Sequence, residues 1–585
     1  MTRPTLLLAI LFVTPSPARA QEPSLLPDSV ITVLAGELSG ETARRNLEYV
    51  ATQHRSRGSR GWHTAGAYVV DRLLAYGLKD AHIESFPADG KRFYGTQRSR
   101  RPWDAEFAEL WELRKKGNGW ERAVLLGSWD AMPVSLAEDS ESGQAVTSLV
   151  DVGDGTSERD YAGKDVRGKL VLAGQQPGAV QHLAIDRFGA AGIVSYAQNQ
   201  HTAWWGEDGN LVRWGHLDSF SATPAFGFMI SLKQGRALRQ RLAAGEEIRL
   251  DAKVMAGQHA GAYEVVTATI PGADTRLAEE EIAFSCHLDH QRPGANDNAS
   301  GCMGILEAAR TLAKLISEGR LARPARTLRF IWPPEIEGTL ALLNGKPELA
   351  RRIKAVIHMD MVGGGPETKA IFHVTRGPGS LPSFVYDVGA AFGRLVNRES
   401  AEFAGTGSAR WPLVSPEGGR EALQADFAEF TMGSDHDVYG EGSYRIPAIY
   451  LNDWPDRYIH TNFDVPANVD PTKLERAAFI GAASGYYLAT LGSDRVPALL
   501  ALLQRESLRR TATMLERQAE LDTVQGVFLE LEHFTAEKAI IASVESFAPL
   551  SQRQRTDAAA MLLAEEQTSR SAGALIGIAA GPGHP

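Results

Sequence analysis

Residues 281–301, with the sequence EIAFSCHLDHQRPGANDNASG, decide the fold of this chain. The stretch begins with a short apolar run over 281–286 that is bounded by charged residues, a pattern that predicts a buried strand. A loop containing glycine follows, and residues 298–300 then open a helix with the apolar run MGILEAARTLAKLI. The stretch therefore predicts a strand that leads through a polar loop into a helix.

Polar side chains gather where this strand ends. His287 and Asp289 stand two residues apart, so an extended backbone would point both side chains the same way. Asp297 follows ten residues after His287. An imidazole and two carboxylates between a strand and a helix are the hard, open set of ligands that a catalytic zinc needs. A capping aspartate and a surface histidine would explain any one of these residues, but not the whole block together with the later strand ends of the chain.

Length and composition limit the classes of protein to consider. A chain of 585 residues is too long for one ordinary core, which predicts two or three domains. Hydrophobic residues make up 43% and charged residues 23%, as in soluble globular proteins. Because the net charge is −10 and no long basic run occurs, we expect neither nucleic acid nor a membrane surface as a partner.

The N-terminal residues have the pattern of an export signal. Arg3 precedes an apolar run over 6–13, and Ala18-Arg19-Ala20 matches a cleavage site. We therefore expect a signal peptide over 1–20, cut near Ala20, and a secreted or periplasmic protein. The only two cysteines are Cys286 and Cys302, so we expect no reliance on a disulfide framework. Cys286 is interpreted as a small buried hydrophobic residue, and the sequence leaves a bond to Cys302 open.

From about 256 to 492, strand-like runs alternate with helical runs. This order predicts an α/β domain with a mixed central sheet and helices on both faces. Ligands of such sheets bind outside the carboxyl ends of the strands. Residues 21–120, with two helical patterns between 39 and 77, are assigned to the same domain as its N-terminal part. Leu- and Ala-rich periodic runs predict a helical C-terminal region over 493–585, without a cluster of reactive residues.

Between 121 and 255 the pattern changes to short β-type runs broken by Gly and Asp. Two segments before apolar runs, 168–169 (GK) and 189–192 (GAAG), resemble the pattern of the protease-associated domain. The resemblance implies an inserted, mainly-β domain that shapes access to a neighbouring site. Its aromatic loop is interpreted either as a lid or as an ordinary packed loop, and it carries Trp204, Trp205 and Trp214. Ahead of this segment, residues 103–111 predict a short helix.

Three further strand ends of the α/β domain carry metal-ligating residue types. Glu335 and Glu337 follow one apolar run, Asp360 ends another, and His460 lies near the end of the domain. Two zinc ions about 3.5–4 Å apart need one bridging carboxylate, with an imidazole and a further oxygen ligand each. One glutamate must also remain free of metal, because it takes the proton from the attacking water.

These pieces together resemble the zinc-dependent exopeptidases of peptidase family M28. The resemblance covers residues 40–80 and 256–492, and the protease-associated insert is also common in this family. The matching segments are His287-x-Asp289, residues 294–301 (GANDNASG), residues 360–363 (DMVG), Ser434-Asp435-His436, and His460-Thr461 with Asp464.

The resemblance implies a two-zinc site. His287 and Asp360 would bind one zinc ion, Asp297 would bridge, and His460 would bind the second ion. Asp289 would hold the His287 ring in the correct tautomer. Glu335 would be the general base that activates water and then protonates the leaving amine. Asp435 and His436 would shape the wall of the site, whereas His358 is interpreted as a core histidine.

The chain departs from the family pattern at Glu335-Ile336-Glu337. The family has two adjacent glutamates, and Ile336 falls on the position of the second, a zinc ligand. We expect Glu337 to replace it, since residues two apart in an extended segment share a face. The alternatives are a weakly held second zinc, a single metal, or Glu337 as a cap of the next helix. A second departure places Ile459, not Tyr458, before His460, which leaves the oxyanion role unassigned.

The sequence thus predicts an exported metallo-exopeptidase, most simply an aminopeptidase that acts on peptides. Two other functions stay open. One is a non-catalytic binding protein on the same fold, motivated by Ile336. The other is a single-zinc transferase of the glutaminyl-cyclase kind. The preferred side chain, amino- against carboxypeptidase polarity, and the oligomeric state do not follow from the sequence.

Overall fold

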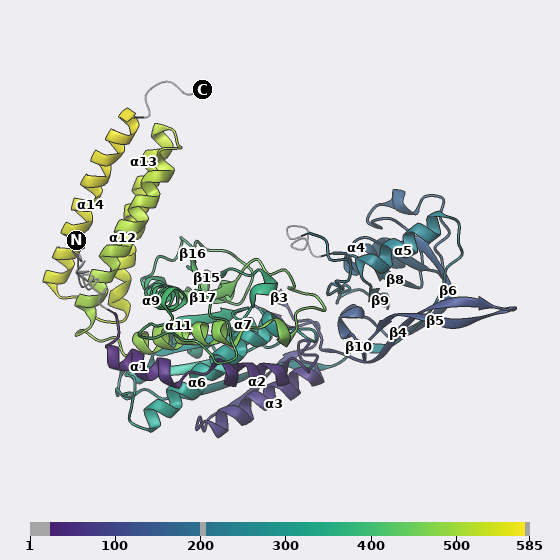
Figure 1. Ribbon diagram of the computed structural model, residues 1–585, viewed down its shortest axis with the longest axis horizontal. Helices are drawn as coiled ribbons and strands as arrows, with labels where there is room; N and C mark the ends of the chain where they lie inside the picture. Colours follow the sequence, from purple (N-terminus) through teal and green to yellow (C-terminus); the bar gives the residue numbers. More distant parts are fainter. Residues whose placement is uncertain (1–23, 199–205, 580–585) are drawn as a thin grey trace, which may run out of the picture.

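The computed structural model describes residues 24–198 and 206–579 (Figure 1). Within these ranges the chain forms a central α/β domain, a second domain inserted into it, and long helices toward the C-terminal end. The expected signal peptide over 1–20, and Trp204 and Trp205 of the aromatic loop, lie outside the described residues. No helix in the described ranges is long and apolar enough to cross a membrane.

The central sheet is mixed, as the sequence predicted. Among the described residues it has eight strands in the order β1-β11-β13-β12-β14-β17-β15-β16. Strands β13, β12, β14 and β17 run parallel, whereas β1, β11 and β15 pair antiparallel with their inner neighbours. The bounds are β1 (His82–Ala88), β11 (Gly261–Ile270), β13 (Thr327–Trp332), β12 (Glu281–Ser285), β14 (Ile353–Asp360), β17 (Ala448–Asp453), β15 (Phe372–Thr375) and β16 (Asp426–Ala428).

Helices cover both faces of this sheet, because the side chains of each strand alternate between the faces. On β12, Ile282 and Phe284 join the larger core, whereas Ala283 joins a smaller core. Over the larger core lie α1 (Asp28–Glu37), α2 (Gly40–Val50), α3 (Arg60–Ala75), α6 (Gly301–Ser317), α9 (Val385–Thr406) and the fully buried α11 (Pro471–Ala489). The smaller core is covered by α7 (Glu337–Gly345), α8 (Pro347–Arg352) and α10 (His436–Gly440).

The inserted domain lies between β1 and β11 along the chain and has its own sheet and cores. In the described ranges this sheet has seven strands in the order β5-β4-β10-β6-β7-β8-β9. They are β4 (Trp103–Lys116), β5 (Gly119–Ser128), β6 (Gly143–Asp151), β7 (Leu170–Ala173), β8 (Gly192–Ser195), β9 (Gly227–Met229) and β10 (Arg249–Gln258), with helices α4 (Pro177–Gln181) and α5 (Leu232–Ala243). A short hairpin, β2 (Phe93–Tyr94) and β3 (Gln97–Arg98), precedes it.

The sheet of the inserted domain begins at Trp103, ahead of the expected boundary at 121. The short helix expected over 103–111 is therefore wrong, and β4 occupies these residues. Their Glu, Leu and Ala content favours a helix, but β4 pairs with β10 on one side and β5 on the other. Pairing and packing of this kind override the intrinsic preference of a segment.

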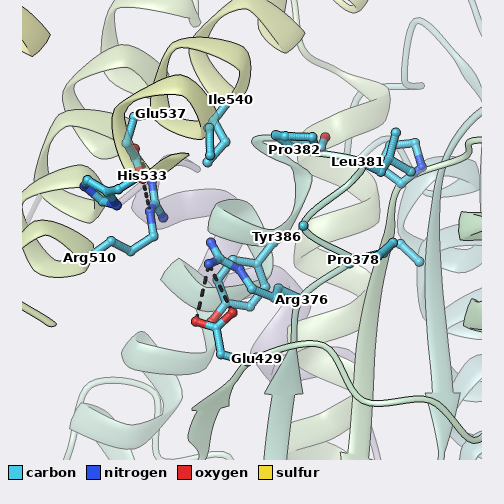
Figure 2. Close-up of a pocket in the computed structure, with 16 residues that line it drawn as sticks. Arg376, Pro378, Leu381, Pro382, Tyr386, Glu429, Arg510, His533, Glu537 and Ile540 are labelled. Carbon is cyan, nitrogen blue, oxygen red and sulfur yellow. Dashed lines mark hydrogen bonds and ion pairs between the residues drawn. The ribbon is translucent and has the colours of Figure 1, made fainter. Parts of the chain in front are cut away.

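Three long helices form the predicted C-terminal helical region, α12 (Val496–Gln518), α13 (Thr523–Ser543) and α14 (Gln552–Ala579). They project away from the central domain in Figure 1. Arg510 of α12 ties them to it, with bonds of 2.6 Å from Nη1 to Asp387 of α9 and from Nε to Glu537 of α13. Figure 2 shows the pocket at this junction, which Arg510 and Glu537 line together with Arg376 and Glu429.

A disulfide joins Cys286 and Cys302, where the sequence had left the pairing open and no reliance on a disulfide was expected. Both residues are fully buried. Cys286 follows β12 and Cys302 lies in the first turn of α6, so the bond closes the polar loop between them. The expectation was wrong because two cysteines 16 positions apart in sequence become neighbours only when strand and helix pack.

We expect the double variant Cys286→Ala/Cys302→Ala to be less stable than the oxidised wild type by about 3 kcal/mol. Removing the bond returns to the unfolded chain the freedom of a loop of roughly 15 residues. Urea unfolding followed by circular dichroism measures the change. A reductant should shift the midpoint of the wild type and leave that of the variant in place; equal midpoints for the variant and the oxidised wild type would contradict the role of the bond.

Candidate metal centre

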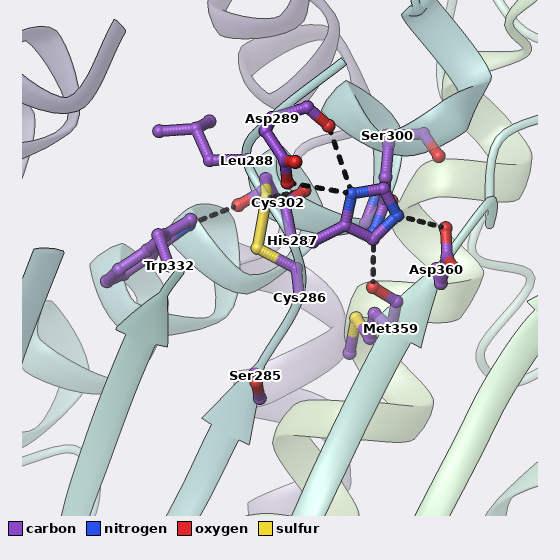
Figure 3. Close-up of a disulfide and its surroundings, with 12 residues drawn as sticks. Ser285, Cys286, His287, Leu288, Asp289, Ser300, Cys302, Trp332, Met359 and Asp360 are labelled. Atoms are coloured by element: carbon purple, nitrogen blue, oxygen red, sulfur yellow. Dashed lines mark hydrogen bonds and ion pairs between the residues drawn. A yellow bond between two sulfur atoms is a disulfide. The ribbon is translucent and has the colours of Figure 1, made fainter. Parts of the chain in front are cut away.

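The candidate site lies where four parallel strands of the central sheet end. His287 follows β12, Glu335 follows β13, Asp360 is the last residue of β14, and His460 comes after β17. Because β13, β12, β14 and β17 are parallel neighbours, their carboxyl ends meet at one edge of the sheet. Figure 3 shows the His287 ring between Asp289 and Asp360, beside the disulfide.

One half of the site is built around His287. Its Nε2 lies 3.3 Å from Oδ1 of Asp297, 3.3 Å from Oδ1 of Asp360 and 4.0 Å from Oε1 of Glu335. The His287 side chain is almost fully buried, whereas 36% of the Glu335 side chain remains exposed. We call the set of His287, Asp360 and Oδ1 of Asp297 the first half-site.

The other half of the site uses the second oxygen of Asp297. Oδ2 of this carboxylate lies 2.9 Å from Nε2 of His460 and 3.3 Å from Nε2 of His290. We call the set of His290, His460 and Oδ2 of Asp297 the second half-site. One buried carboxylate thus presents one oxygen to each half-site, which is the arrangement of a ligand that bridges two metal ions.

The residues present fit divalent metal ions. The ligand atoms of His290, Asp297 and His460 lie within 4.8 Å of one another, as do those of His287, Glu335 and Asp360. Nε2 of His290 and Oδ1 of Asp360 are buried without a hydrogen-bond partner among the described residues. Such atoms are costly unless something pairs with them. Imidazole and carboxylate are together the ligands that zinc takes.

The electrostatics of the site favour a bound cation. Burial alone would lower the pKa of His287, but the carboxylates of Glu335 and Asp360 raise this pKa well above its ordinary value. Burial raises the pKa of Glu335 well above its ordinary value as well, and Asp360 adds to the rise although His287 opposes it. The carboxylates of the site therefore carry more negative charge than its imidazoles can neutralise, and a bound metal ion would compensate the excess.

Asp289 lies behind the first half-site, where it was expected. Its Oδ1 accepts a hydrogen bond of 2.6 Å from the backbone N–H of Glu335 and lies 3.5 Å from Nδ1 of His287. Nδ1 of His287 is also 3.1 Å from the backbone oxygen of Asp289. One carboxylate therefore fixes both the imidazole and the backbone of the expected base, and it leaves Nε2 of His287 turned toward the half-site.

Asp464 holds the loop that carries the bridging carboxylate. Its two oxygens accept backbone N–H bonds from Asn296, at 2.6 Å, and from Asp297, at 3.0 Å. Both residues belong to the irregular turn η6 (Ala295–Ser300) that precedes α6. The Asp464 carboxyl is buried, which raises its pKa to about 7, with a further rise from Asp456. This turn positions Asp297 between the half-sites.

Glu337 is not at the metal centre, contrary to the sequence-based expectation. Its carboxylate forms a bidentate ion pair with Arg100, at 2.9 and 3.0 Å, and lies 3.7 Å from Nε of Arg57. The reason is a turn at Ile336, whose φ of 56° ends the extended segment, so that α7 begins at Glu337. The two glutamates therefore do not share a face, and Glu337 lies in the first turn of that helix.

Ile336 is packed away from the half-sites. Its side chain lies against the smaller core, and its backbone N–H donates a 2.7 Å bond to Oδ1 of Asp435. Asp435 is fully buried, which raises its pKa to about 7. His358 is a buried core histidine as expected, with Nε2 2.8 Å from the Ser434 hydroxyl. The segment 434–436 thus supports the wall of the site.

His290 is the site residue that the sequence analysis missed. It directly follows Asp289, so the segment His287-Leu288-Asp289-His290 supplies an imidazole to each half-site. A signal for it was present, since a missing carboxylate at 336 required another ligand and a histidine stood beside two assigned site residues. What the sequence lacked was the direction of the His290 side chain.

The inserted domain reaches the second half-site through Trp214. The backbone N–H of Trp214 donates a 2.7 Å bond to the carbonyl of His460. The Trp214 ring lies 5.0 Å from that of His290 and 5.1 Å from that of His460, centroid to centroid. The aromatic loop was interpreted either as a lid or as a packed loop. Trp214, its tryptophan within the described residues, packs on the candidate ligands.

A buried ion-pair network also joins the two domains beside Glu337. Arg57 of the central domain pairs with Glu138 and, at 2.9 Å, with Asp139, both of the inserted domain. The Arg57 side chain is only 3% exposed. Since buried charges are costly when they lose a partner, this network fixes how the domains meet.

We expect Glu337→Gln to keep its full metal content and to lose stability. The substitution breaks the ion pair with Arg100 and weakens that with Arg57, at a cost of about 1–3 kcal/mol. Metal content by mass spectrometry and the midpoint of thermal unfolding measure the two effects. The matched variant Asp297→Asn should lose metal. Loss of metal from Glu337→Gln itself would return Glu337 to the ligand set.

Comparison with known proteins shows what the segment that carries this site is similar to. The model of peptidase family M28 matches residues 265–484, which include every residue of both half-sites. Leucine aminopeptidase 1 of Arthroderma gypseum is 30% identical over 126 residues, which cover 20% of this chain and 33% of that protein. Leucine aminopeptidase 1 of Phaeosphaeria nodorum is 30% identical over 161 residues, which cover 24% and 40%. The chain thus matches between a third and two fifths of the length of these relatives.

Solved structures show the same fold. BSAP, a zinc aminopeptidase from Bacillus subtilis, superimposes with a TM-score of 0.52 at 16% identity, over 77% of this chain and 94% of that chain. A peptidase M28 precursor from Shewanella amazonensis gives a TM-score of 0.53 at 15% identity, over 79% and 96%. The part of the chain at residues 265–484 matches the model of peptidase family M28, and these solved structures share its fold.

Proposed function

We propose that this protein is a metal-dependent aminopeptidase that removes N-terminal residues from peptides. The observation that carries the proposal is the Asp297 carboxylate, with one oxygen toward His287 and the other toward His290 and His460. A bridged pair of half-sites at the carboxyl ends of strands supports hydrolysis of a peptide bond. The relatives named leucine aminopeptidase favour the N-terminal end of the peptide as the site of cleavage.

The bound metals, zinc in this proposal and two in number, would polarise the scissile carbonyl and lower the pKa of the attacking water. Glu335 is the group that takes the proton of that water and delivers it to the leaving amine. Its side chain is the most open of the carboxylates around the first half-site, at 36% exposed, so it is accessible to the attacking water. Asp289 holds the Glu335 backbone in place.

Tyr450 is a candidate for the oxyanion role that the sequence left unassigned. It lies on β17, and its ring stacks on that of His436 with centroids 3.9 Å apart. Burial raises the pKa of Tyr450 well above its ordinary value, and the carboxylates of Asp360 and Glu335 add to the rise. The phenol therefore stays protonated and is a hydrogen-bond donor toward the carbonyl oxygen as negative charge develops there.

We further propose that the inserted domain is a protease-associated domain that shapes access to the site, and that the protein is exported. The segments 168–169 and 189–192 support the first proposal, together with the contact of Trp214 with the site. The sequence of residues 1–20 supports the second.

We expect Glu335→Gln to lower kcat by about 10²–10⁴-fold, because the amide cannot accept the proton, while metal content stays unchanged. Hydrolysis of a panel of aminoacyl-nitroanilides measures turnover, and mass spectrometry measures metal. The matched variant Glu348→Gln, at an exposed position of α8, should behave as the wild type. Near-normal turnover in Glu335→Gln would remove Glu335 from the mechanism. A wild-type protein without bound metal would point instead to a binding protein.

A further inference from the structure

We infer that His290 supplies the ligand that the second half-site lacks at Ile336, so that this half-site rests on two imidazoles, with Trp214 of the inserted domain packed against both. The inference deepens the proposed function and rests on it for the presence of metal. Its consequence concerns which cation the second half-site takes. Two neutral nitrogens and one shared carboxylate oxygen form a more nitrogen-rich set than the one imidazole and two carboxylates of the first half-site.

The hydrogen bonds of His290 leave the correct nitrogen free. Nδ1 of the ring is 2.9 Å from the backbone oxygen of Gln291, so Nδ1 carries the proton and donates it. Nε2 then has a lone pair, faces Oδ2 of Asp297, and is buried without a hydrogen-bond partner among the described residues. Histidines that bind metal through one ring nitrogen commonly donate the N–H of the other ring nitrogen to a carbonyl, and this bond fixes the tautomer.

The backbone of His290 is fixed as firmly as its ring. Arg55 and His290 exchange two backbone hydrogen bonds, of 2.9 and 3.1 Å. The guanidinium of Arg55, fully buried, donates to the carbonyls of Leu288 and Gly294 on either side, both at 2.8 Å. The loop that presents His290 is therefore built in advance, and it does not have to reorganise to bind a cation.

Trp214 packs against both imidazoles of the second half-site, although 38% of the His460 side chain remains exposed. Besides the bond from Trp214 to the His460 carbonyl, the backbone N–H of Val212 donates to Oδ1 of Asn462 at 2.8 Å, and the Val212 carbonyl accepts from the backbone N–H of Asn462 at 3.1 Å. These bonds hold His460 in a left-handed backbone conformation, with φ 57°, which a residue with a side chain adopts at a cost. The indole ring against both imidazoles also restricts the orientation of these two candidate ligands.

The ligand chemistry then separates the two half-sites. Imidazole nitrogens favour zinc, nickel and cobalt, whereas carboxylate oxygens are better suited to manganese and magnesium. We therefore expect the second half-site to discriminate against Mn²⁺ more strongly than the first. In a family member with a glutamate at the position of Ile336, the second half-site would have one nitrogen less and would not discriminate in this way.

The test is metal binding by the full-length protein, freed of metal with a chelator and titrated with Zn²⁺ or Mn²⁺ alone. Calorimetry and mass spectrometry count the ions. The wild type should bind two Zn²⁺ but one Mn²⁺ in the micromolar range. His290→Ala should keep one Zn²⁺ and bind the second at least about 100-fold more weakly. His290→Glu should regain the second ion and admit a second Mn²⁺, which keeps the test sound if the alanine variant folds poorly.

Three further variants extend the metal-binding test. His63→Ala, a histidine exposed on α3, is the matched control and should bind metal as the wild type does. Trp214→Ala should weaken the second Zn²⁺ by about 10-fold, whereas Trp214→Phe, which keeps an aromatic ring, should not. The Co²⁺-loaded wild type and His290→Glu should also differ in visible absorption, because a nitrogen ligand is exchanged for oxygen.

The outcomes are distinct for the two proposals. A wild type that binds no Zn²⁺ overturns the proposed function and the inference with it. Two Zn²⁺ ions in His290→Ala at unchanged affinity overturn the inference and leave the aminopeptidase proposal standing. A wild type that binds a single Zn²⁺ overturns the inference and the two-metal form of the proposed function. A wild type that binds two Mn²⁺ as readily as two Zn²⁺ overturns the claim that the second half-site prefers zinc to manganese. An unchanged zinc affinity in Trp214→Ala overturns the claim that the inserted domain supports this half-site.

Discussion

The buried carboxylate of Asp297 is the constraint on which the rest of the structure depends. A carboxylate with both oxygens out of bulk water is costly unless positive charge or donors surround it. Here imidazoles lie on both sides of it, and Asp464 holds its backbone from behind. The residues that surround this carboxylate come from the strand ends, from the irregular turn before α6 and from the loop after β17. The charge of the site is balanced when cations take up the positions between the carboxylate and the rings.

The loop that carries this carboxylate is held by covalent and non-covalent means together. The disulfide between Cys286 and Cys302 joins the end of β12 to the start of α6, and residues 287–301 lie between its ends. Arg55 donates to carbonyls within the same loop. Three candidate ligands, His287, His290 and Asp297, therefore sit on a loop with little freedom left, so that a cation meets a site that is already formed.

The inserted domain contributes residues that contact the candidate metal site. Its Trp214 packs against the rings of His290 and His460, and its acidic pair Glu138 and Asp139 surrounds the buried Arg57. That network includes Glu337, whose carboxylate lies 3.7 Å from Nε of Arg57 and is not among the metal ligands. In the proposed site, the imidazole of His290 stands in for the carboxylate ligand that is absent at Ile336.

The order of strands and helices in the central domain followed from apolar periodicity, since burial on both faces of a parallel sheet leaves a strong pattern. The placement of His287, Glu335 and Asp360 followed too, because each lies at or just past a strand end and such ends meet at one edge, whereas Asp297 and His460 lie farther along their loops and were assigned through the resemblance to the M28 family. The disulfide, the role of Glu337 and the ligand His290 did not follow. Each depends on a direction in space: two cysteines brought together by packing, a backbone turn at Ile336, and a ring aimed by a hydrogen bond to Gln291. Sequence spacing carries the period of a strand, but only the folded backbone decides where a side chain beyond the strand end points.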